Sequence, residues 1–179
     1  ELYMLQQETD QALNEYISIL EHAPQELFAY LGLASIYEYK GDDDKTLAAY
    51  RQIIALAPQS PIGYNQVAYH LAQRQEGLDE ALALAQKSLE LAPRSGGFLD
   101  TLGWVHFKRG EYNEAVRYLE TAVEGIPGSS TVRFHLGMAY YEQGQLDKAL
   151  FQFRTARLFD SQFPEAEEAQ RMIAKAERR

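Results

Sequence analysis

The histidine and acidic side chains are the groups of this chain that could bind a metal or support catalysis. The histidines are His22, His70, His106 and His135, and no two of them are four residues apart, the spacing of a helical metal site. His106 and His135 are expected on neighbouring helices, but a metal site requires three or four ligands. We therefore predict that His106 faces the core and has a hydrogen-bond partner.

Three consecutive carboxylates, Asp42 to Asp44, resemble a cation site only at first inspection. Consecutive side chains at a turn diverge, and acidic residues suit the start of a helix, so we interpret the triplet as a helix cap. The glycines at Gly96, Gly97 and Gly103 are not followed by the Lys-Ser/Thr pair of a phosphate loop. With no Gly-x-Ser-x-Gly and no cysteine, we predict no enzyme, no metal and no cofactor.

Composition and charge limit the classes of partner. The 179 residues contain 17 Lys and Arg against 26 Asp and Glu, a net charge of −9, which argues against nucleic-acid binding. No apolar run approaches the roughly 20 residues that span a bilayer, and no signal peptide is visible. The absence of cysteine is compatible with the cytoplasm or the periplasm of a bacterium. The length suits one compact domain or one continuous array.

Two kinds of residue recur through the chain at regular intervals. Prolines stand 34, 35 and 34 residues apart, at Pro24, Pro58, Pro93 and Pro127. About halfway between them stand Gly41, Gly77, Gly110 and Gly144. Proline ends a helix because it lacks an N–H, and glycine past a helix end adopts the left-handed conformation cheaply. The pattern predicts a series of hairpins, each made of two short helices.

The stretch 99–122 shows such a hairpin most clearly. Its first half places Leu102 and Gly103 on one helical face, and its second half places Ala115, Leu119 and Ala122 on another. Small residues on facing helices let the two backbones approach closely. We therefore expect the helices of each pair to pack tightly through these positions.

A helix–turn–helix unit of 34 residues is similar to the tetratricopeptide repeat family. The resemblance implies an all-α, right-handed solenoid with repeats at 27–60, 61–95, 96–129 and 130–163, the second carrying one extra residue in its turn. Residues 1–26 would be a truncated repeat, with Tyr3, Ala12 and Tyr16 at family positions. Residues 164–179 carry one apolar stripe and are expected to form a C-terminal capping helix.

In this family one face of the first helix of each repeat lines a concave groove that binds peptide segments. The matching positions give the candidate binding residues, which are Phe28, Leu31, Ser35, Ile62, Asn65, Tyr69, Asp100, Trp104, Phe107, Lys108, Phe134, Met138 and Tyr141. Glu38, Tyr39 and Gln73 continue the same face. Aromatic residues are frequent binding anchors, and Asn65 and Asp100 could hydrogen-bond a partner's backbone. The alternative is that these aromatics pack between neighbouring helices.

These observations predict a non-catalytic protein–protein interaction scaffold whose partner is a peptide or helix, with no nucleic acid and no small-molecule substrate. The alternative is a self-associating, homo-oligomeric module. The stretch LDTLGW, followed by a Gly-Glu-Tyr turn, is similar to bacterial repeat proteins, many of them tied to envelope assembly or polysaccharide export. The localisation is therefore left open between the envelope and the cytoplasm.

Overall fold

The computed structural model describes the backbone of residues 2–178 and the side chains of residues 8–178. This part of the chain forms helices and turns without a strand. The helices are α1 (Leu2–His22), α2 (Leu27–Lys40), α3 (Asp43–Leu56), α4 (Pro61–Arg74), α5 (Leu78–Leu91), α6 (Gly96–Lys108), α7 (Tyr112–Gly125), α8 (Ser130–Glu142), α9 (Leu146–Phe159) and α10 (Ala166–Ala176). None of them, within the described residues, is both long enough and apolar enough to cross a membrane.

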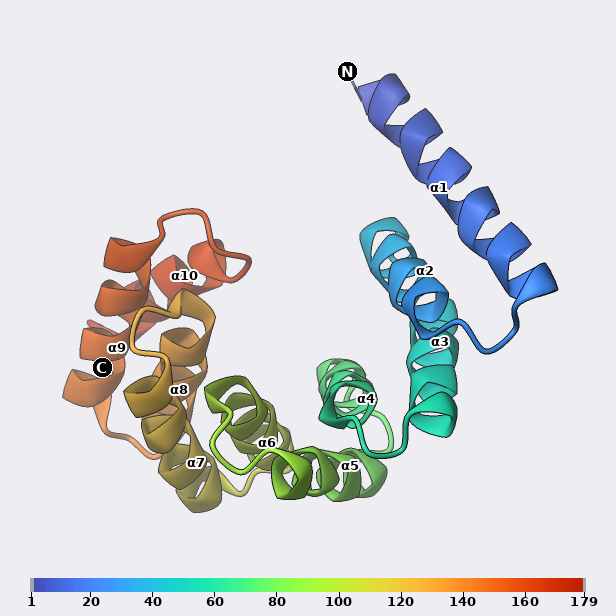
Figure 1. Cartoon of the computed structure of the whole chain (residues 1–179). Helices are drawn as coiled ribbons and strands as arrows, with labels where there is room; N and C mark the ends of the chain where they lie inside the picture. Colours follow the sequence, from blue (N-terminus) through green and yellow to red (C-terminus); the bar gives the residue numbers. More distant parts are fainter. Residues whose placement is uncertain (1, 179) are drawn as a thin grey trace.

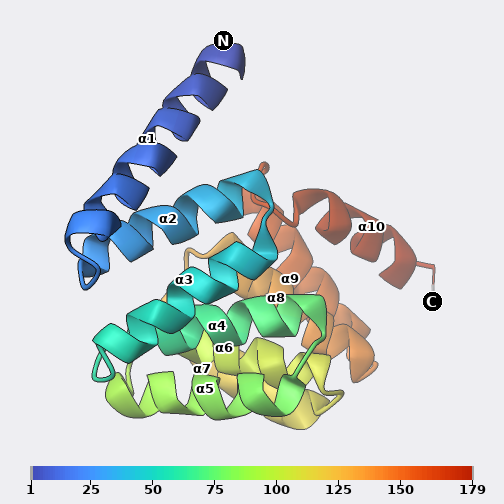
Figure 2. The same ribbon diagram turned by 90° about the vertical axis from the view of Figure 1, so that its right-hand side faces the viewer.

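Helices α2 to α9 form antiparallel pairs that stack side by side in an arc (Figure 1). The inner layer of the arc consists of α2, α4, α6 and α8, and the outer layer of α3, α5, α7 and α9. The inner helices α4, α6 and α8 also pack against the outer helix of the preceding pair. Helix α1 projects away from the body at one end, and α10 packs against α9 at the other (Figure 2). This is the predicted all-α solenoid.

The turns between the paired helices form at the predicted glycines. Gly41, Gly77, Gly110 and Gly144 have positive φ angles between 53° and 77°, a region that costs glycine little. The extra residue of the second repeat has a visible consequence, because Gln75 also adopts a left-handed conformation, with φ of 55°. That turn therefore contains two left-handed residues, and the other three contain one.

Tight packing inside each pair follows from its small residues. A Cβ added to Gly103 would lie 2.6 Å from Leu119 Cγ, and one added to Gly137 would lie 2.6 Å from Phe153 Cε1. Ala115 and Ala122 of α7 are completely buried. The predicted close approach of the two helices is confirmed for α6 and α7.

Helix α1 differs from a truncated helical pair because it is one continuous helix. Gln7 stands 34 residues before Gly41, at the place where the other repeats turn, and without a glycine the chain continues as a helix. Tyr3 lies outside the described side chains. Tyr16 makes an edge-to-face contact with Phe28, with ring centroids 6.4 Å apart. The division of the chain into repeats at the stated residues stays a prediction.

The C-terminal helix α10 buries its apolar stripe as expected. The buried side chains are those of Ala166, Ala169, Met172, Ile173 and Ala176. They join the core cluster that contains residues of α7, α8 and α9. Charged residues occupy the other side of α10, so the helix closes the apolar end of the stack and presents a polar face to solvent.

Candidate interaction groove

The candidate groove residues lie on the inner helices, whose spacing changes along the arc. The backbones of α4 and α6, and of α6 and α8, lie close together, whereas the backbones of α2 and α4 barely approach each other within the described residues. The inner helices are visibly farther apart at the α2 end in Figure 1. In the middle of the inner helices the burial of equivalent positions differs, since Ser35 of α2 is exposed and Trp104 of α6 is buried.

Trp104 illustrates the buried end. Its indole is only 5% exposed and stacks on His135 and Phe107, with ring centroids 4.0 and 4.7 Å away. The indole N–H donates to Gln73 Oε1 of α4 over 3.3 Å, and the Lys108 ammonium lies 4.7 Å from the ring centroid. Helices α4, α6 and α8 thus enclose the side chain. For Trp104, packing between helices describes the surroundings better than an exposed groove does.

Asp100 and Asn65 are also buried, at 8% exposure each. Asp100 Oδ1 lies 2.8 Å from Nδ1 of the fully buried His135, so this carboxylate is already engaged inside the protein. Asn65 donates from Nδ2 to Gln66 Oε1 over 3.2 Å. Its Oδ1 is buried and has no hydrogen-bond partner among the described residues. Such an acceptor is costly to leave without a partner.

The chain's own C-terminal segment covers the groove positions of α8. Phe134 is 2% exposed and its ring centroid lies 6.3 Å from that of Phe163. Tyr141 is 2% exposed, and the Lys175 ammonium of α10 lies 5.1 Å from its ring centroid. Met138 is partly buried against the core. The capping segment therefore occupies the position in which a partner was expected on α8.

Lys108 forms part of the groove floor beside Trp104. Burial lowers the pKa of Lys108, and the negative charge of Glu168 at the start of α10 opposes that shift. Phe107, next to it, is half-buried. Tyr69 lies nearby in a similar environment, where burial raises the pKa of its hydroxyl and the charges of Glu165, Asp100 and Glu38 add to the effect. This part of the groove is therefore acidic in character.

The α2–α4 end of the groove presents apolar side chains to solvent. Phe28 is 53% exposed, Tyr39 62% and Ile62 46%. Ser35 is exposed as well, and Leu31 is half-buried. Tyr69, Phe107, Lys108 and Met138 are half-buried like Leu31, so the exposed apolar side chains of the predicted face are those of Phe28, Tyr39 and Ile62. Apolar side chains that gather on one face mark an interaction surface.

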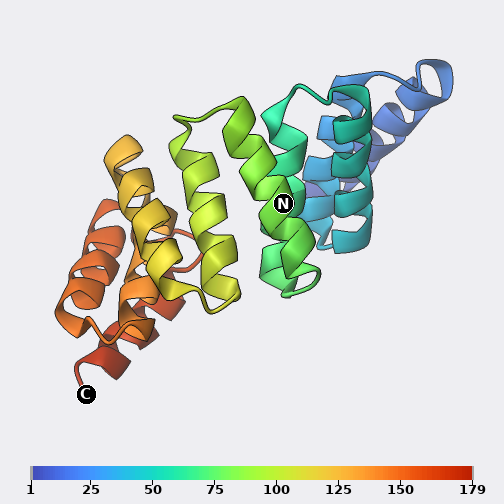
Figure 3. The ribbon, with the colours of Figure 1, turned by 90° about the horizontal axis from the view of Figure 1, so that it is seen from below.

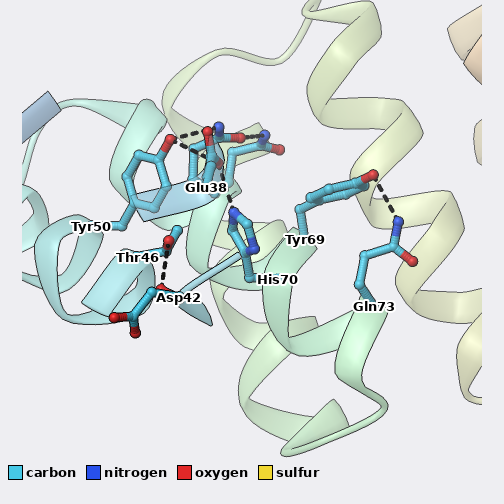
Figure 4. Close-up of polar contacts among 9 residues, drawn as sticks. Glu38, Asp42, Thr46, Tyr50, Tyr69, His70 and Gln73 are labelled. Atoms are coloured by element: carbon cyan, nitrogen blue, oxygen red, sulfur yellow. Dashed lines mark hydrogen bonds and ion pairs between the residues drawn. The ribbon is translucent and has the colours of Figure 1, made fainter. Parts of the chain in front are cut away.

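A hydrogen-bond network forms the wall between α2, α3 and α4 (Figure 4). Glu38 Oε1 accepts from Tyr50 Oη over 3.1 Å and lies 2.8 Å from His70 Nε2. Gln66 Nε2 donates to Tyr50 Oη over 3.2 Å. Burial is the main reason that the pKa of Tyr50 is raised to about 12. The network holds Glu38, a groove residue, in a fixed position.

A second short chain of bonds runs from α4 to α6. Gln73 Nε2 donates to Tyr69 Oη over 2.7 Å, while Gln73 Oε1 accepts from the Trp104 indole. Sequence reasoning placed Tyr69, Gln73 and Trp104 on one face but missed the roles of Tyr50, Gln66 and His70. The available signal was the polarity of Gln66 and His70 on the inner helix α4.

The remaining candidates for chemistry have structural roles. His106 is 7% exposed, and its Nδ1 lies 2.6 Å from Glu111 Oε2, as predicted for a core-facing histidine with a partner. Asp42 caps α3 by accepting from the backbone N–H of Lys45 over 3.3 Å, which confirms the capping interpretation. Within the described part of the chain, no three His, Cys, Asp or Glu side chains are arranged to hold a metal ion.

Paired helices stacked in an arc define the class of helical-repeat proteins. Two tetratricopeptide repeat family models match the chain, one over residues 28–60 and one over residues 106–176. The chain belongs to the tetratricopeptide repeat family. Proteins of this family are generally non-catalytic scaffolds, and the fold generally mediates protein–protein interaction.

Relatives and solved structures agree with this assignment. The TPR repeat-containing protein PA4667 of Pseudomonas aeruginosa is 30% identical over 118 residues, 66% of this chain and 20% of the relative. TTC0263, a thermophilic TPR protein of Thermus thermophilus, aligns over 99% of this chain and 94% of its own, with a TM-score of 0.74 and 25% identity. The Cut9–Hcn1 structure gives a TM-score of 0.83 at 19% identity, over 97% of this chain and 34% of the other. The chain spans about a fifth or less of the length of the curated relatives it matches.

Proposed function

We propose that the chain is a non-catalytic protein-binding module whose partner is a peptide segment held at the α2–α4 end of the concave groove. The observation that carries the proposal is the exposure of Phe28, Tyr39 and Ile62 on the inner helices, at 53%, 62% and 46%. A partner that covers these apolar side chains gains roughly 25 cal/mol of binding free energy per Å² of apolar surface removed from water. The hydrogen-bond network of Glu38, Tyr50 and His70 forms the wall beside these residues.

The charges around this surface define the chemistry of the partner. Glu38 stands beside the exposed residues, and Glu165 and Glu168 lie close enough to act on Tyr69 and Lys108. A segment that combines apolar side chains with Lys or Arg suits both the apolar surface and the carboxylates.

The test selects partners without assuming their identity. Random peptides displayed on phage are selected against the chain, and each selected peptide is then titrated against the double variant Phe28→Ala, Ile62→Ala. We expect a class of peptides enriched in apolar and basic residues to lose affinity by roughly tenfold or more. Both residues are about half exposed, so the variant should keep the circular dichroism spectrum and urea midpoint of the parent.

A matched control separates this surface from other exposed apolar residues. The double variant Phe151→Ala, Leu158→Ala removes similar side chains from the outer face of α9, where they are 62% and 81% exposed. Peptides held in the groove should bind this control variant as they bind the parent. The proposal fails if no selected peptide loses affinity on the groove substitutions.

Self-association as a module of an envelope assembly stays the alternative prediction. Light scattering over a concentration series separates it from peptide binding. A monomer at every concentration contradicts self-association, while a dimer that the groove variant abolishes would make a second copy the occupant of the groove.

A further inference from the structure

The outer face of α9 carries large apolar side chains in contact with solvent. Leu158 is 81% exposed, Phe151 62% and Phe159 52%. Phe151 and Leu158 are seven residues apart, two helical turns, so they point in the same direction. The four outer helices lie in a row when the arc is seen from its outer side (Figure 3). We call Phe151, Leu158 and Phe159 the α9 patch.

The other outer helices, all of them within the described chain, carry no equivalent patch. The repeat places Ala48, Ala83 and Arg117 at the position of Phe151, and Ala55, Glu90 and Glu124 at the position of Leu158. All six of these residues are exposed, like the two residues of α9 that they match. The position therefore faces solvent throughout the solenoid and is small or charged everywhere except in α9.

A further repeat stacked after α10 would not cover the α9 patch. Each of the helices α3, α5 and α7 is followed by another helical pair, and its residues at these two positions nevertheless remain exposed. Helix α10 does not cover the patch either, although it packs against α9. The solenoid architecture therefore leaves the patch open, and whatever covers it must approach from the outer side.

The charge of α9 points to the kind of partner. Helix α9 contains Lys148, Arg154 and Arg157 against one carboxylate, Asp147, which gives +2 in a chain of net charge −9. By contrast, α7 contains one arginine and three glutamates, which gives −2.

Two basic residues flank the patch directly. Arg154 is three residues from Phe151 and four from Leu158, on the same stripe, and its 59% exposed side chain pairs with Glu177 over 2.6 Å. Lys148 lies on the other flank, with its ammonium 5.0 Å from the centroid of the Tyr140 ring.

A second copy of the chain is a poor occupant. Two α9 patches placed face to face would bring the Arg154 side chains together near the two-fold axis, and like charges oppose such a contact. Three side chains also provide much less than the roughly 800 Å² per partner that a stable dimer buries. The charge and the small area both favour a single helix from another protein.

We propose that the α9 patch is a second interaction site, which docks an acidic amphipathic helix of another protein. Its apolar residues, spaced by three and four, cover Phe151 and Leu158, while Asp and Glu on its edges face Lys148 and Arg154. The contact is small and partly electrostatic, so its affinity falls as the salt concentration rises. This site is independent of the groove and lies on the opposite layer of helices.

The experiment uses two designed helical peptides as probes. Both carry leucines spaced by three and four; one has glutamate and the other lysine at the flanking positions. Each fluorescently labelled peptide is titrated with the parent chain, with Phe151→Ala, Leu158→Ala and with the groove variant Phe28→Ala, Ile62→Ala. We expect the acidic peptide to lose roughly tenfold or more in affinity on the α9 substitutions and to bind the groove variant unchanged.

Several results would overturn the proposal. The acidic peptide could fail to bind at millimolar concentration, or it could bind the parent and the α9 variant with equal affinity. The lysine peptide could also lose as much affinity as the acidic peptide on the α9 substitutions. If the acidic peptide binds the parent and the α9 variant equally but no longer binds the groove variant, the peptide occupies the groove instead of the α9 patch. A concentration-dependent dimer of the parent that Leu158→Glu abolishes would make a second copy the occupant.

Discussion

The substitution Trp104→Ala distinguishes an exposed anchor of the groove from a side chain that packs between helices. If Trp104 were an exposed anchor of the groove, its replacement by alanine would weaken the binding of a partner and leave folding intact. As a side chain 5% exposed between α4, α6 and α8, it should instead support the stability of the solenoid. The substitution Trp104→Ala therefore tests how the inner helices pack.

The magnitude follows from the contacts that the substitution removes. The indole stacks on His135 and Phe107 at 4.0 and 4.7 Å between centroids, and alanine would leave a cavity in their place. Truncation of a buried tryptophan costs about 3–5 kcal/mol. Gln73 is exposed, so water can replace the indole N–H on its side-chain carbonyl, and the lost hydrogen bond adds little to the cost.

Urea unfolding followed by far-UV circular dichroism measures the effect, since the chain's one tryptophan is lost in the variant. With a urea dependence of about 2 kcal/mol per M, the midpoint should fall by about 1.5–2.5 M. Tyr39→Ala is the matched control, because this aromatic is 62% exposed and its loss should change the free energy of unfolding by less than about 0.5 kcal/mol.

If Trp104→Ala unfolds at the same urea concentration as the parent but binds the selected peptides more weakly, Trp104 is an exposed anchor and the inner helices are farther apart than described. A smaller effect is expected for Trp104→Phe, which keeps most of the stacking and loses the hydrogen bond to Gln73.

Two further predictions concern the packing of the pairs and the polar wall. Ala115→Asp places a carboxylate at a completely buried position and should lower the free energy of unfolding by at least about 3 kcal/mol. The control Ala48→Asp, at an exposed position, should lower it by less than about 0.5 kcal/mol. The urea midpoints of the two variants and the parent measure both effects. Burial raises the pKa of Tyr50 to about 12, so the unfolded chain ionises first and stability is lost as the pH rises from about 10 to about 12. Between pH 9 and pH 11 the ionisation of Tyr50 in the unfolded chain should lower the free energy of unfolding of the parent by about 1.4 kcal/mol. The variant Tyr50→Phe should not show this loss when its own values at the two pH values are compared. Equal pH dependence of parent and variant would contradict the prediction.

The repeat architecture was predictable because local residue chemistry determines it. Gly41 turns because glycine tolerates positive φ, and Gly103 allows close packing because it lacks a Cβ. The apolar stripe of residues 166–176 identified the capping helix from periodicity alone. Even the continuous α1 had a local signal, since Gln7 stands where the other repeats have a glycine.

The exposure of the groove residues was not predictable in the same way. Ser35 and Trp104 stand at equivalent positions of α2 and α6, yet Ser35 is exposed and Trp104 is only 5% exposed. The backbones of α2 and α4 approach each other less than those of α4 and α6, and this spacing depends on contacts distributed over the stack. Tyr141 is buried because α10 folds back over it, a contact between residues far apart in the sequence.

Amide chemical-shift mapping with a peptide from the selection tests whether the α2–α4 end of the groove is the surface that binds a partner peptide. We predict that the largest shifts fall on residues 27–40 of α2 and 61–74 of α4, and that they disappear in Phe28→Ala, Ile62→Ala. Shifts confined to α8 and α10, or to the outer helices, for every selected peptide would contradict the proposal.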